Sequence, residues 1–371
     1  MEKNILSYLD LKKDISFSQL DFNEYDGLIF ARISYVRFPK KMEKEMSGYL
    51  KDIATKVLAF GDRKTKDIFR LKEDHDLLEI ILTSKRYENI YIKSFKDEIS
   101  VEQNEQFYAL HFINKDKDNS FDIISYRGTD GTAVGWKEDF DLCYKRETFA
   151  QIDAKKFLKN SFELFSQRPV YLVGHSKGGN LAVYAASTIT KGAQKRIAKI
   201  YTYDSPGFNS IFFMKSKFET IKSKIEAYAP DASVIGRLMD VNVPLNVVKS
   251  KQFLLLQHNI YNWRLEDGEF VRLDKFSRRS NVIKNFLDSK LVDMNMTERK
   301  KMVEKIYVII NTLQYDGLLS LDSNPIKLAM RLQKIKREFP EFKDAINSLF
   351  ENELGFEDIK LVKPIKIKKS R

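Results

Sequence analysis

The sequence predicts an α/β fold with a mostly parallel sheet flanked by helices, and three observations lead to it. Between residues 151 and 249, short apolar runs alternate with segments of helix length, the pattern of βαβ units. Three aromatic and β-branched runs precede this region, at 90–98, 106–113 and 121–126. From about residue 278 the sequence becomes helical in period and rich in charge.

The amino-terminal part is predicted to be helical. Asn23 is a plausible N-cap for a helix over 23–38, with acidic residues in its first turn, and a second helix over 42–60 ends near Gly61. The three strand-like runs that follow are separated by polar turns such as 114–120. They predict an antiparallel meander leading into the central sheet.

The alternating region predicts helices and strands in turn. Its helices are expected at 151–166, 179–196 and 211–222, and its strands at 170–173, 199–203, 225–229 and 243–249. Asp267-Gly268 between two short apolar runs predicts a hairpin over 263–273. The last helices are expected at 280–291, 297–314, 326–338 and 340–353.

The chain of 371 residues is long enough for one large domain or two ordinary ones. We expect a sheet domain over 1–277, which includes a helical extension at 1–85, and a helical block over 278–356 packed on it. A basic tail, 357–371, completes the chain. We expect this tail to be solvated, with peripheral contact to an acidic surface as the alternative.

Composition narrows the function classes. Hydrophobic residues make up 43% and charged residues 31% of the chain, which is typical of a globular protein. Cys143 is the single cysteine and there are four histidines, so we expect no disulfide framework, no metal site and no cofactor. The net charge of +12 is spread along the chain without a recognisable nucleic-acid module, so no nucleic-acid partner is expected. Neither a signal peptide nor a membrane span is evident, which predicts a cytoplasmic protein.

The most informative motif is Gly174-His175-Ser176-Lys177-Gly178. An apolar strand runs into it and an alanine-rich helix runs out of it, the strand, turn and helix of a nucleophile elbow. The two glycines allow a tight turn that would present the Ser176 hydroxyl above the sheet. A glycine-rich structural turn with a capping serine is the alternative reading.

Elimination leaves one histidine as general base. His175 lies inside the elbow and points away from the serine by strand alternation, while His75 and His111 precede the nucleophile. In α/β-hydrolases the order along the chain is serine, acid, histidine. His258, where an apolar run gives way to a polar turn, is therefore the expected base.

Three aspartates between the serine and His258 are candidates for the residue that orients the base. Asp204 and Asp231 each follow a predicted strand, and Asp240 is a third option. We favour Asp231, because one further βα unit separates it from the neighbourhood of the nucleophile. A helix N-cap or a turn would account equally for an aspartate at each place.

Two residues are expected to supply hydrogen-bond donors around a developing negative oxygen. The first is Lys177, the residue after the nucleophile, through its main-chain N–H, and the second is Thr129, in the tight turn after the strand 121–126, through its N–H and its hydroxyl. Such a turn is common, so it indicates an oxyanion hole only together with the nucleophile elbow.

These residues resemble the class 3 lipase branch of the α/β-hydrolases. The matching blocks are Tyr126-Arg127-Gly128-Thr129, Trp136-Lys137-Glu138-Asp139, the elbow through Asn180, and Thr202-Tyr203-Asp204-Ser205-Pro206-Gly207. Within that branch the chain is most similar to bacterial Mbeg-like hydrolases, over most of its length. The resemblance implies an α/β-hydrolase-like fold and a serine esterase or lipase.

Two positions depart from the lipase pattern. The lipases usually have Gly-Ala-Pro where this chain has Asp204-Ser205-Pro206, and their acid block D-x-V-P-x-L places Ser233 at the acid position. Either the loop is shifted locally or another residue orients His258.

The sequence thus predicts a serine hydrolase that cleaves a carboxylic ester or thioester of a small acyl or lipid substrate. Ser176, His258 and Asp231 would form the triad, and Thr129 and Lys177 the oxyanion hole. The alternative is a hydrolase-shaped binding or regulatory protein whose site is vestigial.

Overall fold

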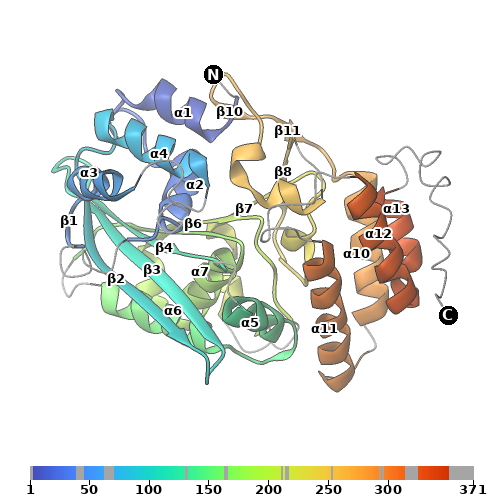
Figure 1. The fold of residues 1–371 in the computed structure, drawn as a ribbon. Coiled ribbons are helices and arrows are strands. Elements are labelled where there is room, and N and C mark those ends of the chain that lie inside the picture. The colour runs from blue at the N-terminus through green and yellow to red at the C-terminus, as the bar shows by residue number, and fades with distance from the viewer. Residues whose placement is uncertain are drawn as a thin grey trace, which may run out of the picture. The chain divides into compact units, whose positions relative to one another are not determined.

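A computed structural model gives the fold (Figure 1). It describes residues 3–38, 46–61, 71–129, 133–162, 166–209, 212–213, 217–251, 254–291, 294, 296–313 and 325–350. The chain divides into two compact units, Met1–Phe276 and Ser277–Arg371. The expected basic tail lies outside the described residues, and the packing of the helical block on the sheet domain stays a prediction.

The first unit is built on a nine-stranded sheet of order β1-β2-β3-β4-β5-β6-β7-β8-β11. The strands are β1 Gly48–Tyr49, β2 Ile90–Ser100, β3 Glu105–Asn114, β4 Phe121–Tyr126, β5 Val170–His175, β6 Ile197–Tyr203, β7 Ile225–Pro230, β8 Leu245–Val248 and β11 Arg272–Leu273. Strands β4 to β8 are parallel to one another. The meander β2-β3-β4 is antiparallel, as predicted, and with β1 and β11 it makes the whole sheet mixed.

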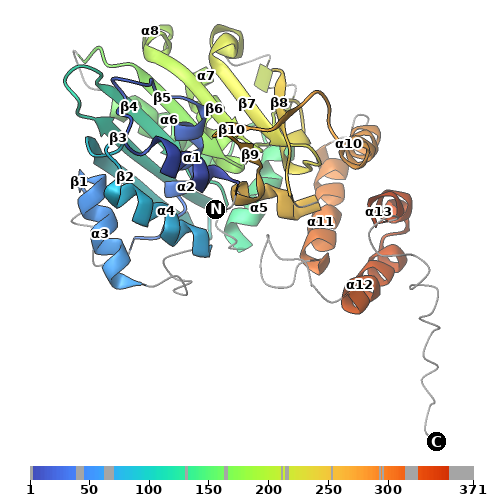
Figure 2. The same cartoon turned by 90° about the horizontal axis from the view of Figure 1, so that it is seen from above.

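Helices cover both faces of this sheet (Figure 2). Consecutive residues of a strand point to opposite faces, so Ile123 of β4 lies in one apolar cluster and Ile124 in the other. The first cluster packs under α1 Ile5–Lys12, α2 Glu24–Ile33, α3 Leu50–Phe60 and α4 Lys72–Thr83. The second packs under α6 Phe149–Ser161 and α7 Lys177–Thr188. This layering is that of an α/β-hydrolase-like fold.

Buried ion pairs tie the amino-terminal helices together. Asn23 caps α2 by accepting from the N–H groups of Tyr25 and Asp26, as its position in the sequence predicts. Asp26 also binds Arg86, and both side chains are fully buried. Arg32 of α2 binds Asp74 of α4 through two hydrogen bonds of 2.5 and 2.7 Å. The helical extension is therefore an integral layer of the first unit.

Three predicted helices differ from the structure. The segment 179–196 is interrupted at Ile189, because Thr190 caps a separate helix, α8 Lys191–Arg196. Within the described part of 211–222, the turns Phe218–Thr220 and Lys222–Lys224 are 3-10 helices. The helix expected over 42–60 begins at Leu50, after the short strand β1.

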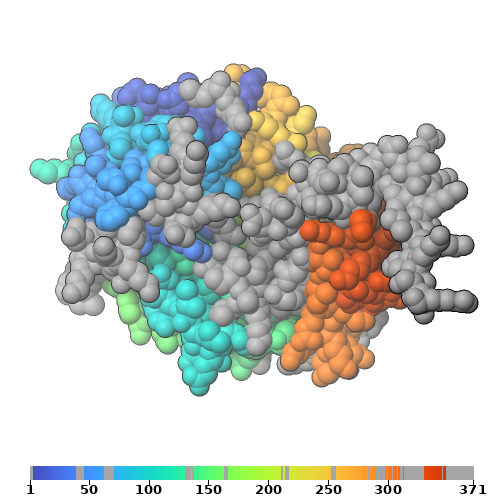
Figure 3. Space-filling model, viewed as in Figure 1, coloured from blue at the N-terminus to red at the C-terminus, as the bar shows by residue number. Residues whose placement is uncertain are grey.

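The hairpin signal at Asp267-Gly268 is confirmed. Both residues have positive φ, 52° and 82°, which a two-residue hairpin turn of this type requires. The turn joins β9 Leu265–Glu266 to β10 Glu269–Phe270. At the other side of the unit, the β2–β3 hairpin protrudes in the space-filling view (Figure 3), and its tip exposes Val101.

The second unit contains α10 Arg278–Leu291, α11 Met296–Leu313, α12 Pro325–Glu338 and α13 Lys343–Phe350, with the 3-10 turn Pro340–Phe342 before α13. Its buried apolar side chains include Met302, Ile309, Leu332, Ile335, Phe342 and Ile346. Met302 and Ile309 belong to the apolar stripe that the helical period predicts. Among the described residues, no helix is both long and apolar enough to span a membrane.

Candidate active site

The nucleophile elbow predicted from the sequence is present. Strand β5 ends at His175, α7 begins at Lys177, and Ser176 between them has φ 59° and ψ −136°. This backbone conformation is strained for a residue with a side chain and is typical of functional turns. The Ser176 N–H donates to the Tyr203 carbonyl at 2.9 Å, which fixes the turn to the end of β6.

The two glycines of the motif are required because neighbouring backbone atoms lie close to their Cα atoms. A Cβ on Gly174 would lie 2.2 Å from the carbonyl carbon of Gly178, and a Cβ on Gly178 would lie 2.0 Å from the carbonyl oxygen of Tyr126. Backbone fills both places, so no side chain fits there. The first turn of α7 therefore packs directly on β5 and on the end of β4.

His258 is held beside an aspartate. Its Nδ1 lies 2.7 Å from Oδ2 of Asp204, and both residues are buried. A carboxylate only accepts hydrogen bonds, so Nδ1 carries a proton, and in the neutral imidazole Nε2 then has the lone pair. This is the tautomer that a general base requires. Asp204 follows β6 directly, with a positive φ of 44°.

The aspartate beside His258 is thus Asp204, an alternative in the sequence analysis, and not the favoured Asp231. Oδ1 of Asp231 accepts from the Ser250 N–H at 3.0 Å, and its N–H donates to Val248, so Asp231 closes the loop after β8. Asp240 is exposed, and its carboxylate accepts from the Asn242 N–H in a turn. Asp231 and Asp240 are therefore turn residues, which is the alternative that the sequence analysis gave for each candidate.

The other carboxylate oxygen of Asp204 is bound by the loop after β7. Oδ1 accepts from the Gly236 N–H at 2.9 Å and from the Ser233 hydroxyl at 2.5 Å. Ser233 occupies the acid position of the lipase pattern, and its hydroxyl binds Asp204, which follows the neighbouring strand β6. The irregularity of the acid block has a structural explanation.

His258 also lies against the elbow through His175. Nε2 of His175 donates to the His258 carbonyl at 2.8 Å, and the two imidazole rings are 4.3 Å apart between centroids. The Tyr35 hydroxyl lies 3.1 Å from Nδ1 of His175 and accepts from the Gly128 N–H at 3.1 Å. His175 is therefore a contact residue of the site and not a base.

The loop after β4 lies beside the nucleophile, as predicted. A Cβ on Gly128 would lie 2.9 Å from Cβ of Ser176, so the neighbouring Thr129 is close to the serine. The Thr129 hydroxyl donates to Oδ2 of Asp139 at 2.5 Å. Asp139 belongs to α5, Ala133–Tyr144. The sequence analysis expects this hydroxyl to donate to a reacting oxygen, whereas the structure binds it to Asp139.

Burial raises the pKa of Asp139 from its usual value of 3.8 to about 6, against the opposing effects of the Lys177 charge and the Thr129 hydrogen bond. The native state then holds this proton more tightly than the unfolded chain between about pH 4 and pH 6, so this group makes stability fall as pH rises through that window. Asp139→Asn removes the effect.

We therefore compare the free energies of unfolding of Asp139→Asn and wild type. The difference, variant minus wild type, should increase by about 1–3 kcal/mol from pH 4 to pH 7. Urea unfolding of both proteins at the two pH values measures it. The amide oxygen of the variant can still accept from the Thr129 hydroxyl, so the pH-dependent part of the difference reports the loss of the titrating group. A difference that does not change with pH would contradict the assignment.

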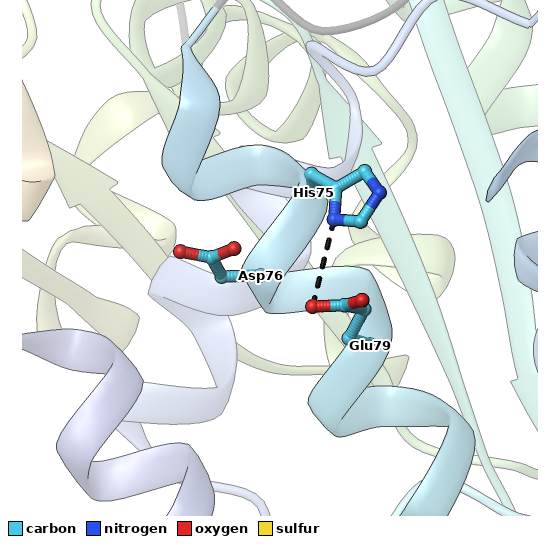
Figure 4. Close-up of side chains that lie close together, drawn as sticks. All are labelled: His75, Asp76 and Glu79. Atoms are coloured by element: carbon cyan, nitrogen blue, oxygen red, sulfur yellow. Dashed lines mark ion pairs between the residues drawn. The ribbon is translucent and has the colours of Figure 1, made fainter. Parts of the chain in front are cut away.

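Apart from the site around Ser176, helix α4 brings together three residues of types that can bind a metal ion. Ligand atoms of His75, Asp76 and Glu79 are within 4.8 Å of one another (Figure 4). Nδ1 of His75 is 3.5 Å from Oε2 of Glu79 one helical turn later. The spacing of His75 and Glu79, four residues apart on one helix, accounts for their contact.

The sequence analysis missed part of the site. The motif blocks contain Asp139 and Ser233, but the sequence assigns neither of them a contact within the site. Lys177 was chosen for its main-chain N–H, whereas its side chain is 1% exposed and binds Glu138 at 2.7 Å. A lysine directly after the nucleophile at the buried start of a helix was the available signal.

Comparison with known proteins places the chain in a family. The family model described as Mbeg1-like matches residues 81–308, more than half of the chain. Among solved structures, the crystal structure of M37 lipase is similar over 90% of this chain and 98% of its own, with 11% identity and a TM-score of 0.36, too low for residue-level comparison. No curated protein matches. The family match confirms the resemblance to Mbeg-like hydrolases, and the chain belongs to the Mbeg1-like family.

Proposed function

We propose that this protein is a serine hydrolase that cleaves a carboxylic ester or thioester of an acyl or lipid substrate. Ser176 is the nucleophile, His258 the general base and Asp204 the residue that orients the base. The observation that carries the proposal is the strained Ser176 backbone at the elbow together with the 2.7 Å contact between His258 Nδ1 and Asp204 Oδ2.

In the first half-reaction the Ser176 Oγ attacks the acyl carbon and its proton passes to Nε2 of His258. The carbonyl oxygen becomes an oxyanion, which the main-chain N–H groups of Lys177 and Thr129 stabilise. Collapse of this intermediate expels the alcohol or thiol, which takes the proton from His258. Water then attacks the acyl-enzyme by the same route in reverse, releasing the acid and restoring Ser176.

A vestigial site that serves only binding or regulation is the competing function. The observation in its favour was the serine at the expected acid position. Because Asp204 holds the base and Ser233 supports Asp204, that observation supports an intact triad equally well. The enzyme reading also accounts for the strained serine, which a binding protein does not need.

Labelling by a fluorophosphonate probe tests the proposal, because the probe reacts with serines activated by a base. We expect rapid labelling of the wild type and none of Ser176→Ala. Ser205→Ala is a matched control, since Ser205 is 9% exposed, as is Ser176, but lies after β6. It should be labelled like the wild type. Folded wild type that resists labelling would favour the binding protein.

A further inference from the structure

The side chain of Lys177 points into the protein from the first residue of α7. Its ammonium group donates to the Gln106 carbonyl at 2.7 Å, to the Gln106 side-chain oxygen at 3.2 Å and to Oε2 of Glu138 at 2.7 Å. An ammonium group has three protons, so each one has an acceptor. The lysine next to the nucleophile is therefore fixed at both its main chain and its charged end.

Glu138 joins this lysine to two further elements. Its Oε2 also accepts from the Gln106 N–H of β3 at 3.1 Å, and its Oε1 accepts from the Ala150 N–H of α6 at 3.0 Å. Glu138 is 0% exposed. A single carboxylate thus connects the start of β3, helix α5, the first turn of α6 and the elbow.

Stability alone does not explain such a pair. Removing two charges from water costs several kcal/mol per ion, and well-packed apolar residues of similar volume often stabilise a protein as much or more. What the charged pair adds is geometry, because both ends have directional hydrogen bonds. The geometry concerns the residue that follows Ser176, whose main-chain N–H is the proposed oxyanion donor.

The second oxyanion donor is held from the same helix. Glu138 and Asp139 are consecutive in α5, and Asp139 accepts from the Thr129 hydroxyl. One turn of α5 therefore contacts both residues that supply the proposed oxyanion donors. Its two carboxylates bind the side chains of these residues, the Lys177 ammonium group and the Thr129 hydroxyl.

We propose that the Glu138–Lys177 pair is a positioning device that holds the Lys177 main-chain N–H where the tetrahedral oxyanion forms. This role rests on the proposed hydrolase function. Preorganised donors act on the transition state more than on the bound substrate, so their loss lowers kcat with little change in KM. Glu138 and the Lys177 side chain act through the N–H and do not touch the substrate.

The test is hydrolysis of p-nitrophenyl butyrate by wild type, Lys177→Met and Glu138→Gln, with active sites counted by fluorophosphonate titration. Loss of a whole oxyanion donor costs about 10²–10³-fold in kcat, so a displaced donor should cost roughly 30-fold. We expect this fall per titrated site, with KM within about twofold of wild type. Ki for a trifluoromethyl ketone, whose adduct carries the oxyanion, should rise by the same factor.

The double variant Lys177→Met/Glu138→Gln separates positioning from simple structural support. It removes both charges, so unfolding by urea should occur closer to wild type than in Lys177→Met. A positioning pair predicts that kcat stays low although stability recovers. If kcat recovers together with stability, the proposal is overturned.

Asp26→Asn is the matched control for a broken buried ion pair. Asp26 and Arg86 are both fully buried, and the contacts of Asp26 are with the amino-terminal layer. This variant should lose stability while kcat per titrated site stays within about twofold of wild type. If Lys177→Met does not fold, Glu138→Gln, whose amide oxygen can still accept from one of the two backbone donors, decides alone.

A wild-type kcat in both single variants overturns the positioning role and leaves the hydrolase intact. Wild type that neither hydrolyses the ester nor reacts with the probe overturns both the hydrolase and the role.

Discussion

Asp204→Asn is expected to lower kcat for ester hydrolysis by about 10⁴-fold, the loss found when the acid of such a triad becomes an amide. The Gly236 N–H and the Ser233 hydroxyl both donate to Oδ1 of Asp204, so the amide oxygen will occupy that place. The amide NH₂ then faces Nδ1 of His258. Nδ1 becomes the acceptor, Nε2 carries the proton, and the base has no lone pair for the serine. Initial rates with p-nitrophenyl butyrate measure the loss.

Asp231→Asn is the control for this variant. The Asp231 carboxylate accepts from the Ser250 N–H, and an amide oxygen accepts equally well. We expect kcat within about threefold of wild type and a loss of stability below about 1 kcal/mol. The opposite pattern, with Asp231→Asn inactive and Asp204→Asn active, would restore the assignment that the sequence favoured.

The ambiguity between these aspartates shows what the sequence leaves open. Both follow strands of a parallel sheet, so both lie at the edge where the strands end, and strand order alone brings either within reach of a base. Which aspartate contacts His258 depends on the conformation of the loop that contains His258. In the structure Nε2 of His175 holds the carbonyl of His258, which turns the imidazole toward Asp204. No local pattern encodes such a contact.

The sheet was predictable because its signals are local. The runs that form β2, β3 and β4 are bounded by polar turns, and the elbow combines an apolar strand, two glycines and an alanine-rich helix. The interruption at Ile189 was harder, since the helical period continues across it and only Thr190, as a cap, marks the new start. Helix α4 has a moderate apolar period, and its ion pair with Arg32 became visible only in three dimensions.

The side-chain roles around the oxyanion hole were the least predictable. A lysine and a glutamate separated by 39 positions give no sequence signal of contact, and the pair forms because α5 and the elbow converge on the start of β3. Thr129 was identifiable from its turn, yet the hydroxyl was expected to face the reacting oxygen. Its proton is bound by Asp139 instead. Buried polar networks depend on the whole packing arrangement and thus follow the fold.

Ser176→Ala and His258→Ala are each expected to lower kcat by about 10⁵- to 10⁶-fold, and the double variant should lose little more than either alone. The serine supplies the nucleophile and the histidine takes its proton, so each residue contributes to the rate only when the other is present. Initial rates with p-nitrophenyl butyrate at high enzyme concentration measure the loss, with urea unfolding to verify the fold of each variant.

The residual rate of the double variant distinguishes the triad from independent contributions. Two independent residues would multiply their effects, which would place the double variant far below either single one. Additive losses in free energy would therefore show that His258 does not act on Ser176. Equal residual rates in all three variants would instead identify the contribution of the oxyanion donors and substrate binding, which act without the nucleophile. In Ser176→Ala the Lys177 N–H can still stabilise the oxyanion that forms when water attacks the carbonyl. Adding Lys177→Met displaces this donor, so the residual rate should fall further.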